Sequence, residues 1–259
     1  MGFVFIRRGI VAATCRFFVN LMYRLSLSHP NMQVIFQNTD DMRGFIRSAI
    51  VDRAHASLIR GAGVDLDTFR YLPEPPEPIT FLLVARMLRH KGVVEFVTAA
   101  QAVRSQHPQW CFQLLGDVDA GNPASLSREQ LLAWSADGDV VWLGHRENVA
   151  ELMAQCHIVV LPSYREGLPK TLLEAAACGR AMIASDIAGC REVVRDDVTG
   201  TIVPVRDVEN LKVAMIRMGT DHEFRKRCGE AARKKAEALF SVDDVIRDTF
   251  LAYDQLRAA

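Results

Sequence analysis

The chain has 259 residues, of which 49% are apolar, so it can bury a sizeable core as one large domain or two modest ones. Lysine and arginine together number 31, as do aspartate and glutamate, and the net charge of zero argues against a globally basic nucleic-acid-binding protein. The six cysteines form no Cys-x-x-Cys pair, so we predict neither a zinc site nor a disulfide framework.

An apolar and basic segment, residues 3–27, opens the chain. Polar residues interrupt its apolar run and no small-residue cleavage site follows, so we predict neither a transmembrane helix nor a signal peptide. A helix here would gather Phe17, Phe18, Leu21 and Met22 on one side. Two interpretations stay open: a peripheral contact with an anionic membrane surface, or an ordinary domain helix whose arginines face water.

Short elements follow this segment. We predict a strand over residues 32–36, a helix over 40–48 capped by Thr39 or Asp40, and a second strand over 56–59.

A proline-rich stretch then marks a boundary. Four prolines within residues 72–78 can continue neither a helix nor a central strand, so we expect an interdomain linker at 73–78. The expected organisation is residues 1–72, the linker, a larger domain over 79–240, and a terminal helix over 241–259.

From residue 79 the pattern changes to short apolar strands that alternate with helices. Strands are predicted over residues 79–84, 111–115, 140–142, 158–161, 181–184 and 201–203. Helices are predicted over residues 93–105, 128–134, 149–156, 170–178, 208–218, 221–239 and 242–257. This alternation indicates an α/β fold, in which a doubly wound parallel sheet is covered by helices on both faces.

The strand over 158–161 runs into a loop that contains Gly167 and Pro169, and then into a helix. Gly167 lets the backbone approach a ligand, and Pro169 sits where a missing N–H costs least. The free N–H groups and the dipole of that helix start suit a phosphate. Glu166 and Glu174 flank the helix start and can accept hydrogen bonds from sugar hydroxyls. The stretch therefore predicts a nucleotide-sugar site at the carboxyl edge of the sheet.

Glu166 and Glu174 stand in the string Glu-Gly-Leu-Pro…Leu-Leu-Glu-Ala, with seven residues between the two glutamates. This string resembles the signature of retaining glycosyltransferases of family 4, which have the GT-B fold of two Rossmann-like domains. The bland alternative is a capped amphipathic helix with two solvated glutamates. The resemblance implies that Glu166 holds hydroxyls of the donor sugar, that Glu174 holds the ribose, and that Gly167, Leu168 and Pro169 line the donor site.

Three further loops match the family at single positions. Arg86 and Lys91 match the cations that family members aim at the donor diphosphate, where negative charge grows as the sugar–phosphate bond breaks. Gly116 matches a turn that approaches the nucleotide, and Arg146 resembles a residue that stacks on the base. The alternatives are a basic surface loop for Arg86 and Lys91, and a generic turn for Gly116.

The resemblance implies a hexosyltransferase that moves a sugar, with retention, from a nucleoside-diphosphate sugar, UDP-linked by preference, to a lipid-linked or saccharide acceptor. The chain looks most like bacterial enzymes that build O-antigen or capsule polysaccharide on a polyprenyl-diphosphate carrier, which implies a place at the cytoplasmic face of the membrane. The family needs no metal ion or other cofactor. Two alternatives are a protein that binds nucleotide sugars without transferring them, and a GT-B epimerase that acts on a UDP-sugar.

The chain departs from the family at its front. Residues 1–72 match only the tail of an N-terminal acceptor-side domain, whereas residues 79–240 match a whole donor domain. The helix over 241–259 is expected to cross back onto the N-terminal part. We therefore expect a fragment that binds a nucleoside diphosphate weakly and transfers sugar poorly, because transfer needs both substrates held in a closed, dry cleft.

Overall fold

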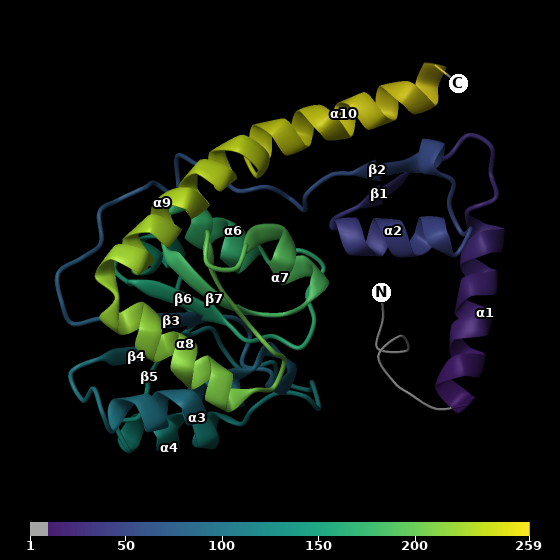
Figure 1. Ribbon diagram of the computed structural model, residues 1–259. Helices are drawn as coiled ribbons and strands as arrows, with labels where there is room; N and C mark the ends of the chain where they lie inside the picture. The colour runs from purple at the N-terminus through teal and green to yellow at the C-terminus, as the bar shows by residue number, and fades with distance from the viewer. Residues whose placement is uncertain (1–9, 259) are drawn as a thin grey trace. The chain divides into compact units, whose positions relative to one another are not determined.

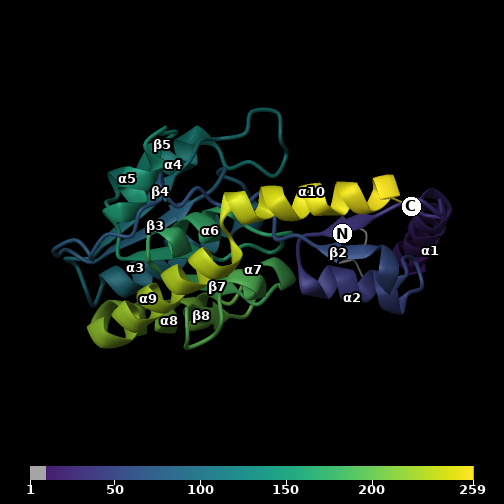
Figure 2. The ribbon, with the colours of Figure 1, turned by 90° about the horizontal axis from the view of Figure 1, so that it is seen from above.

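The computed structural model describes residues 10–258 (Figures 1 and 2). The chain divides into two units, one formed by Met1–Gly61 together with Asp243–Ala259 and the other by Ala62–Val242. The first division therefore falls at Gly61, ahead of the proline-rich stretch over 73–78 where a linker was expected.

The second unit is built on a six-stranded parallel sheet with the order β5-β4-β3-β6-β7-β8. Its strands are β3 (Thr80–Val84), β4 (Cys111–Leu115), β5 (Val141–Gly144), β6 (Ile158–Leu161), β7 (Ala181–Ser185) and β8 (Gly200–Val203). The predicted parallel sheet is confirmed. Since parallel strands share one direction, the loops that follow all six strands lie at the same edge.

Helices cover both faces of this sheet, as Figure 1 shows. They are α3 (Val93–Arg104), α4 (Arg128–Ala136), α5 (Val149–Ala154), α6 (Lys170–Ala177), α7 (Ala188–Val193), α8 (Val208–Thr220) and α9 (His222–Leu239). Helix α7 was not predicted, because Gly189 at its second position indicates a turn. A 3-10 turn, η3 (Arg89–Lys91), precedes α3.

The central strand β3 separates two hydrophobic cores. Phe81 and Leu83 belong to the core that contains α3 and α8, while Leu82 belongs to the core that contains α6 and the second half of α9. Alternate residues of a strand point to opposite faces, and here both faces are dry, which explains why the strand reads as one continuous apolar run.

The proline-rich stretch is a strap fastened to the amino edge of this sheet. The guanidinium of Arg180, fully buried, donates hydrogen bonds to the carbonyl oxygens of Leu72 and Pro73. Arg225, also buried, holds both carboxylate oxygens of Glu74, at 3.0 Å for the Nη2–Oε2 pair. A buried cation is costly unless it is paired, so these contacts tie residues 72–74 to the sheet and leave them no freedom as a linker.

The first unit contains a two-stranded parallel sheet and helices around a small core. Its elements are α1 (Ile10–Ser26), β1 (Val34–Phe36), α2 (Thr39–Arg47), the 3-10 turn η2 (Arg53–His55), β2 (Ala56–Leu58) and α10 (Val242–Ala258), of which Asp243 onward belongs here. The cap of α2 is Asn38, whose side chain accepts a hydrogen bond from the Asp41 amide, rather than Thr39 or Asp40 as predicted. Asn31 donates to the carbonyl of Leu256, which connects the loop after α1 to the C-terminal helix.

Helix α1 carries the apolar side chains that the sequence placed on one face. Phe17 is 66% exposed, and Phe18, Met22 and Leu25 are exposed as well. The first part of the predicted segment, residues 3–9, lies outside the described residues. Within residues 10–258, no helix is both long enough and apolar enough to cross a membrane.

Candidate functional site

The predicted donor residues follow four neighbouring strands. Arg86 and Lys91 come after β3, Gly116 after β4, Arg146 after β5 and Glu166 after β6. These strands are parallel and adjacent, so all five residues lie on loops at the carboxyl edge of the sheet. This edge is where open α/β sheets bind their ligands.

Lys91 and Glu166, separated by 75 positions in the sequence, meet at this edge. The Lys91 ammonium lies 2.6 Å from the Glu166 carboxylate, and the two side chains are only 21% and 12% exposed. The loops approach closely because Gly92, with a φ of +75°, has no side chain: a Cβ there would lie 2.2 Å from the carbonyl oxygen of Pro162. The amide of Tyr164 also donates to the carbonyl of His90, at 2.9 Å.

Arg86 is held separately, in an exposed ion pair. Its guanidinium lies 2.7 Å from Asp119, and its side chain is 64% exposed. Asn122 donates to the same carboxylate, and the Asp119 amide donates to the Ser125 hydroxyl, so the carboxylate is fixed within its loop. Sequence reasoning missed Asp119, because an aspartate in a long loop carries no pairing signal of its own.

Glu174 is buried, at 8% exposure, so the alternative of a solvated glutamate is wrong for this residue. Burial raises the pKa of Glu174, and the ammonium of Lys170 at 3.5 Å opposes that shift only in part. The carboxylate is therefore available for strong hydrogen bonds from a ligand that replaces its lost hydration.

The start of α6 has no side-chain cap. Pro169 is the N-cap, and it offers no side-chain hydrogen bond to the first turn. The Thr171 hydroxyl donates to the carbonyl of Val84, which ties α6 to the end of β3. Leu168 is half-buried beside the core of α6, and Gly167 is exposed.

Gly116 and Gly189 are set by close backbone packing. Gly116 has a φ of +135°, and a Cβ there would lie 1.9 Å from the carbonyl oxygen of Ala85. At Gly189, in the unpredicted helix α7, a Cβ would lie 2.6 Å from the carbonyl oxygen of Gly167. A glycine that directly follows a strand was the available signal for Gly116, whereas Gly189 lies four residues beyond the end of β7 and had no such signal. The packing explains Gly116 without a nucleotide, and Arg146 is exposed in its loop.

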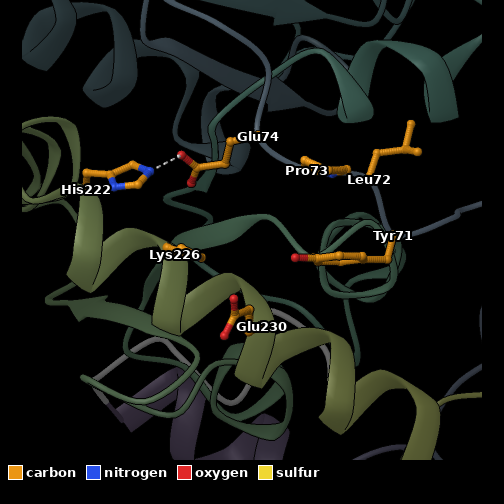
Figure 3. Close-up of a pocket in the computed structure, with 8 residues that line it drawn as sticks. Tyr71, Leu72, Pro73, Glu74, His222, Lys226 and Glu230 are labelled. Carbon is orange, nitrogen blue, oxygen red and sulfur yellow. Dashed lines mark ion pairs between the residues drawn. The ribbon is translucent and has the colours of Figure 1, made fainter.

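A hollow of about 230 Å³ lies elsewhere, between the strap and α9 (Figure 3). Tyr71 and Glu74 face His222, Lys226 and Glu230 across it. Gly179, which precedes β7, also lines it, so the hollow belongs to the amino edge of the sheet and contains none of the predicted donor residues. The chemistry of the loops, rather than the depth of this hollow, identifies the candidate site.

Comparisons with known proteins identify the family and the fold. Residues 66–235 match the family described as glycosyl transferases group 1. The solved structure of Alr3699/HepE from Anabaena, a complex with UDP, superposes with a TM-score of 0.78 over 91% of this chain and 68% of that chain, at 18% identity. At that identity the superposition shows the shared GT-B fold alone.

Sequence relatives extend the comparison to the whole chain. The N,N'-diacetylbacillosaminyl-diphospho-undecaprenol alpha-1,3-N-acetylgalactosaminyltransferase of Campylobacter jejuni is 31% identical over 271 aligned positions, which cover 99% of this chain and 69% of the relative. The UDP-Gal:alpha-D-GlcNAc-diphosphoundecaprenol alpha-1,3-galactosyltransferase of Escherichia coli is 24% identical, over 92% of this chain and 66% of the relative. The chain thus spans about two thirds of the length of both relatives. It belongs to the glycosyl transferases group 1 family, on the match over residues 66–235 and on the 31% identity with the Campylobacter enzyme.

Proposed function

We propose that the carboxyl edge of the second unit binds a nucleoside-diphosphate sugar, and that the chain takes part in the transfer of that sugar to a hydroxyl with retention of configuration. The observation that carries the proposal is the Lys91–Glu166 pair, held beside the start of α6 by the Gly92–Pro162 contact. One cation, one carboxylate and one helix N-terminus together suit a sugar linked to a phosphate.

Each residue has a proposed role in this site. Glu166 accepts hydrogen bonds from hydroxyls of the donor sugar, and Glu174 accepts them from the ribose. Arg86 and Lys91 bind the diphosphate. The remaining contacts come from Gly167, Leu168 and Pro169 around the helix start, from the Gly116 turn near the nucleotide, and from Arg146 at the base.

The proposed chemistry needs stabilisation of a leaving group. As the bond between the anomeric carbon and the phosphate oxygen breaks, that oxygen takes the electron pair, and Arg86 and Lys91 stabilise the growing charge. The acceptor hydroxyl attacks from the same face and gives its proton to the departing diphosphate. In this proposal the two cations stabilise the leaving diphosphate, so the reaction does not require a metal ion or another cofactor.

The acceptor we propose is a sugar or lipid-linked sugar of bacterial surface polysaccharide. Support comes from the two relatives, whose names specify acceptors on diphospho-undecaprenol, and the E. coli name also specifies a UDP-linked donor. A UDP-sugar is therefore the first donor to test, with GDP-sugars as the comparison. Because such an acceptor is anchored in the membrane, we propose that the protein acts at the cytoplasmic face of the membrane. The exposed apolar side of α1 is the proposed contact with the membrane surface.

Calorimetry with UDP-N-acetylglucosamine, UDP-N-acetylgalactosamine and UDP tests donor binding. Arg86→Gln is expected to weaken binding roughly tenfold or more, since it removes a charge-assisted hydrogen bond. Arg89→Gln, an exposed cation on the same loop, is the matched control and is expected to bind as the wild type does. No binding by the wild type would overturn the proposal.

Product analysis separates the reactions. A polyprenyl-diphosphate-linked acceptor incubated with the donor should gain a sugar under the proposed function. An epimerase would instead change the UDP-sugar, and a pure binding protein would change neither molecule.

A further inference from the structure

Tyr164 lies in the loop between β6 and α6, between two charged side chains from other elements. Its hydroxyl donates a hydrogen bond to Glu95 of α3, at 2.5 Å. The guanidinium of Arg206, from the loop after β8, lies over the Tyr164 ring in a cation–π contact, 4.3 Å from the ring centroid. Burial and the contacts with Glu95 raise the pKa of Tyr164, so the phenol stays protonated and keeps donating at neutral pH. One tyrosine thus joins three elements at the carboxyl edge.

Arg206 and Glu95, the two partners of Tyr164, each have an unfavourable feature that lowers the stability of the fold. Arg206 has a φ of +63°, in the left-handed region where a side chain is strained. That strain is of the same order as the gain from an exposed cation–π contact, so the contact gives Arg206 no clear advantage in stability over glycine. The second carboxylate oxygen of Glu95 is buried without a hydrogen-bond partner. These costs point to a role other than stability.

Tyr164 is connected to both members of the Lys91–Glu166 pair. Its amide donates to the carbonyl of His90, the residue before Lys91. Glu166 follows Tyr164 by two positions in the same loop. A shift of the loop backbone at Tyr164, which the anchored side chain opposes, would therefore move Glu166 and break the bond to the turn that carries Lys91.

We propose that Tyr164, clamped between Glu95 and Arg206, is a positioning residue that holds Glu166 and Lys91 in the geometry that receives a nucleoside-diphosphate sugar. This inference rests on the proposed function and assigns it a support outside the donor-contacting residues. The hydroxyl and the ring act separately: the hydroxyl fixes the loop to α3, and the ring fixes it to the loop after β8.

The test measures affinity and thermal stability together, with UDP-N-acetylglucosamine and UDP as probes. Tyr164→Phe removes only the hydrogen bond, and Arg206→Gly removes the cation while it relieves the backbone. We expect each variant to bind UDP-N-acetylglucosamine about three- to tenfold more weakly, the effect of one lost hydrogen bond or contact. We expect the Tm of Arg206→Gly to equal or exceed that of the wild type. Tyr71→Phe, an exposed tyrosine at the amino edge, is the control and should change neither quantity.

Glu95 supplies the conservative rescue. Glu95→Gln keeps an oxygen that accepts from Tyr164 and is expected to bind as the wild type does, whereas Glu95→Leu should match Tyr164→Phe. Wild-type affinity in both Tyr164→Phe and Arg206→Gly would overturn the proposal and leave donor binding intact. A loss of affinity that appears only in variants with a lowered Tm would also overturn it, since that marks a purely structural role. If the wild type binds neither probe, the proposed function fails, and the role of Tyr164 fails with it.

Discussion

Glu166→Gln is expected to make UDP bind more tightly. The Lys91 ammonium is paired with Glu166 at 2.6 Å, so a diphosphate must compete with that carboxylate for it. Two unit charges about 4 Å apart attract by about 4 kcal/mol at an effective dielectric constant of about 20. The 21% and 12% exposure of the two side chains admits some solvent screening, and the retained amide oxygen still accepts from Lys91. We therefore expect a net gain of about 1 kcal/mol, or roughly fivefold in Kd.

The same substitution should weaken the complete donor. A glutamine replaces charge-assisted hydrogen bonds to the sugar hydroxyls with neutral ones, a loss of about 1–2 kcal/mol. That loss exceeds or cancels the gain at the diphosphate. The ratio of the UDP affinity to the UDP-sugar affinity should therefore rise roughly tenfold, which no general loss of folding would produce.

Calorimetry at low and high salt on Glu166→Gln, Lys91→Met and the double variant measures the coupling directly. Lys91→Met should weaken UDP about tenfold, and in its presence Glu166→Gln should no longer tighten UDP. Glu147→Gln, an exposed glutamate in the loop after β5, is the control for net charge. Equal weakening of UDP and UDP-sugar by Glu166→Gln would show that the carboxylate does not compete with a phosphate, and the reasoning would be refuted.

Three further predictions concern the frame of the site. The raised pKa of Glu174 means that the fold loses stability as the pH rises from the ordinary carboxyl value of 4.5 through the raised one. Glu174→Gln should therefore raise Tm at neutral pH and reduce the dependence of Tm on pH in that window. It should also weaken the binding of UDP. A lowered Tm would contradict the prediction. Gly92→Ala should cost about 2–4 kcal/mol in urea unfolding, because the left-handed backbone and the clash with Pro162 add. The control Gly121→Ala, with a φ of +84° and open space around it, should cost only about 1 kcal/mol. Arg225→Met should cost about 3–5 kcal/mol in the same measurement, because it leaves the largely buried Glu74 carboxylate with the more distant His222 ring, at 3.7 Å, in place of a bidentate guanidinium. A loss below about 1 kcal/mol would show that water replaces the guanidinium.

Much of the second unit could be predicted from the sequence, because its strands are buried on both faces. A stretch such as Ile158–Leu161 has no polar residue to mark a surface, so it can only be a central strand. Helix α7 could not be predicted, since Gly189 at its second position indicates a turn. The proline-rich strap was misplaced as a linker because prolines exclude helix and strand but say nothing of the buried arginines that hold them.

The sequence predicted that the site residues share the carboxyl edge of the sheet, but it did not predict the contacts between them. Parallel strands place Lys91 and Glu166 at one edge, yet their pairing depends on the approach of Gly92 to Pro162, which no local pattern shows. The burial of Glu174 had a signal that we did not use. Helix α6 reads Leu-Leu-Glu-Ala-Ala-Ala, and a helix that is apolar all round is a buried helix.

Three of the cation–carboxylate pairs at the carboxyl edge include a predicted donor residue. Two of them, Arg86–Asp119 and Lys170–Glu174, have an exposed cation, and salt and water screen such pairs strongly. The third, Lys91–Glu166, is shielded from solvent and resists exchange. A diphosphate that enters this edge gains charge neutralisation from the exposed cations at little cost, and must displace a carboxylate only at the last contact. Under the proposed function the nucleoside diphosphate has lost its sugar after transfer, so we expect Glu166, without hydroxyls to bind, to return to Lys91. We therefore expect the same pair to slow the final step of donor binding and to promote release of the product.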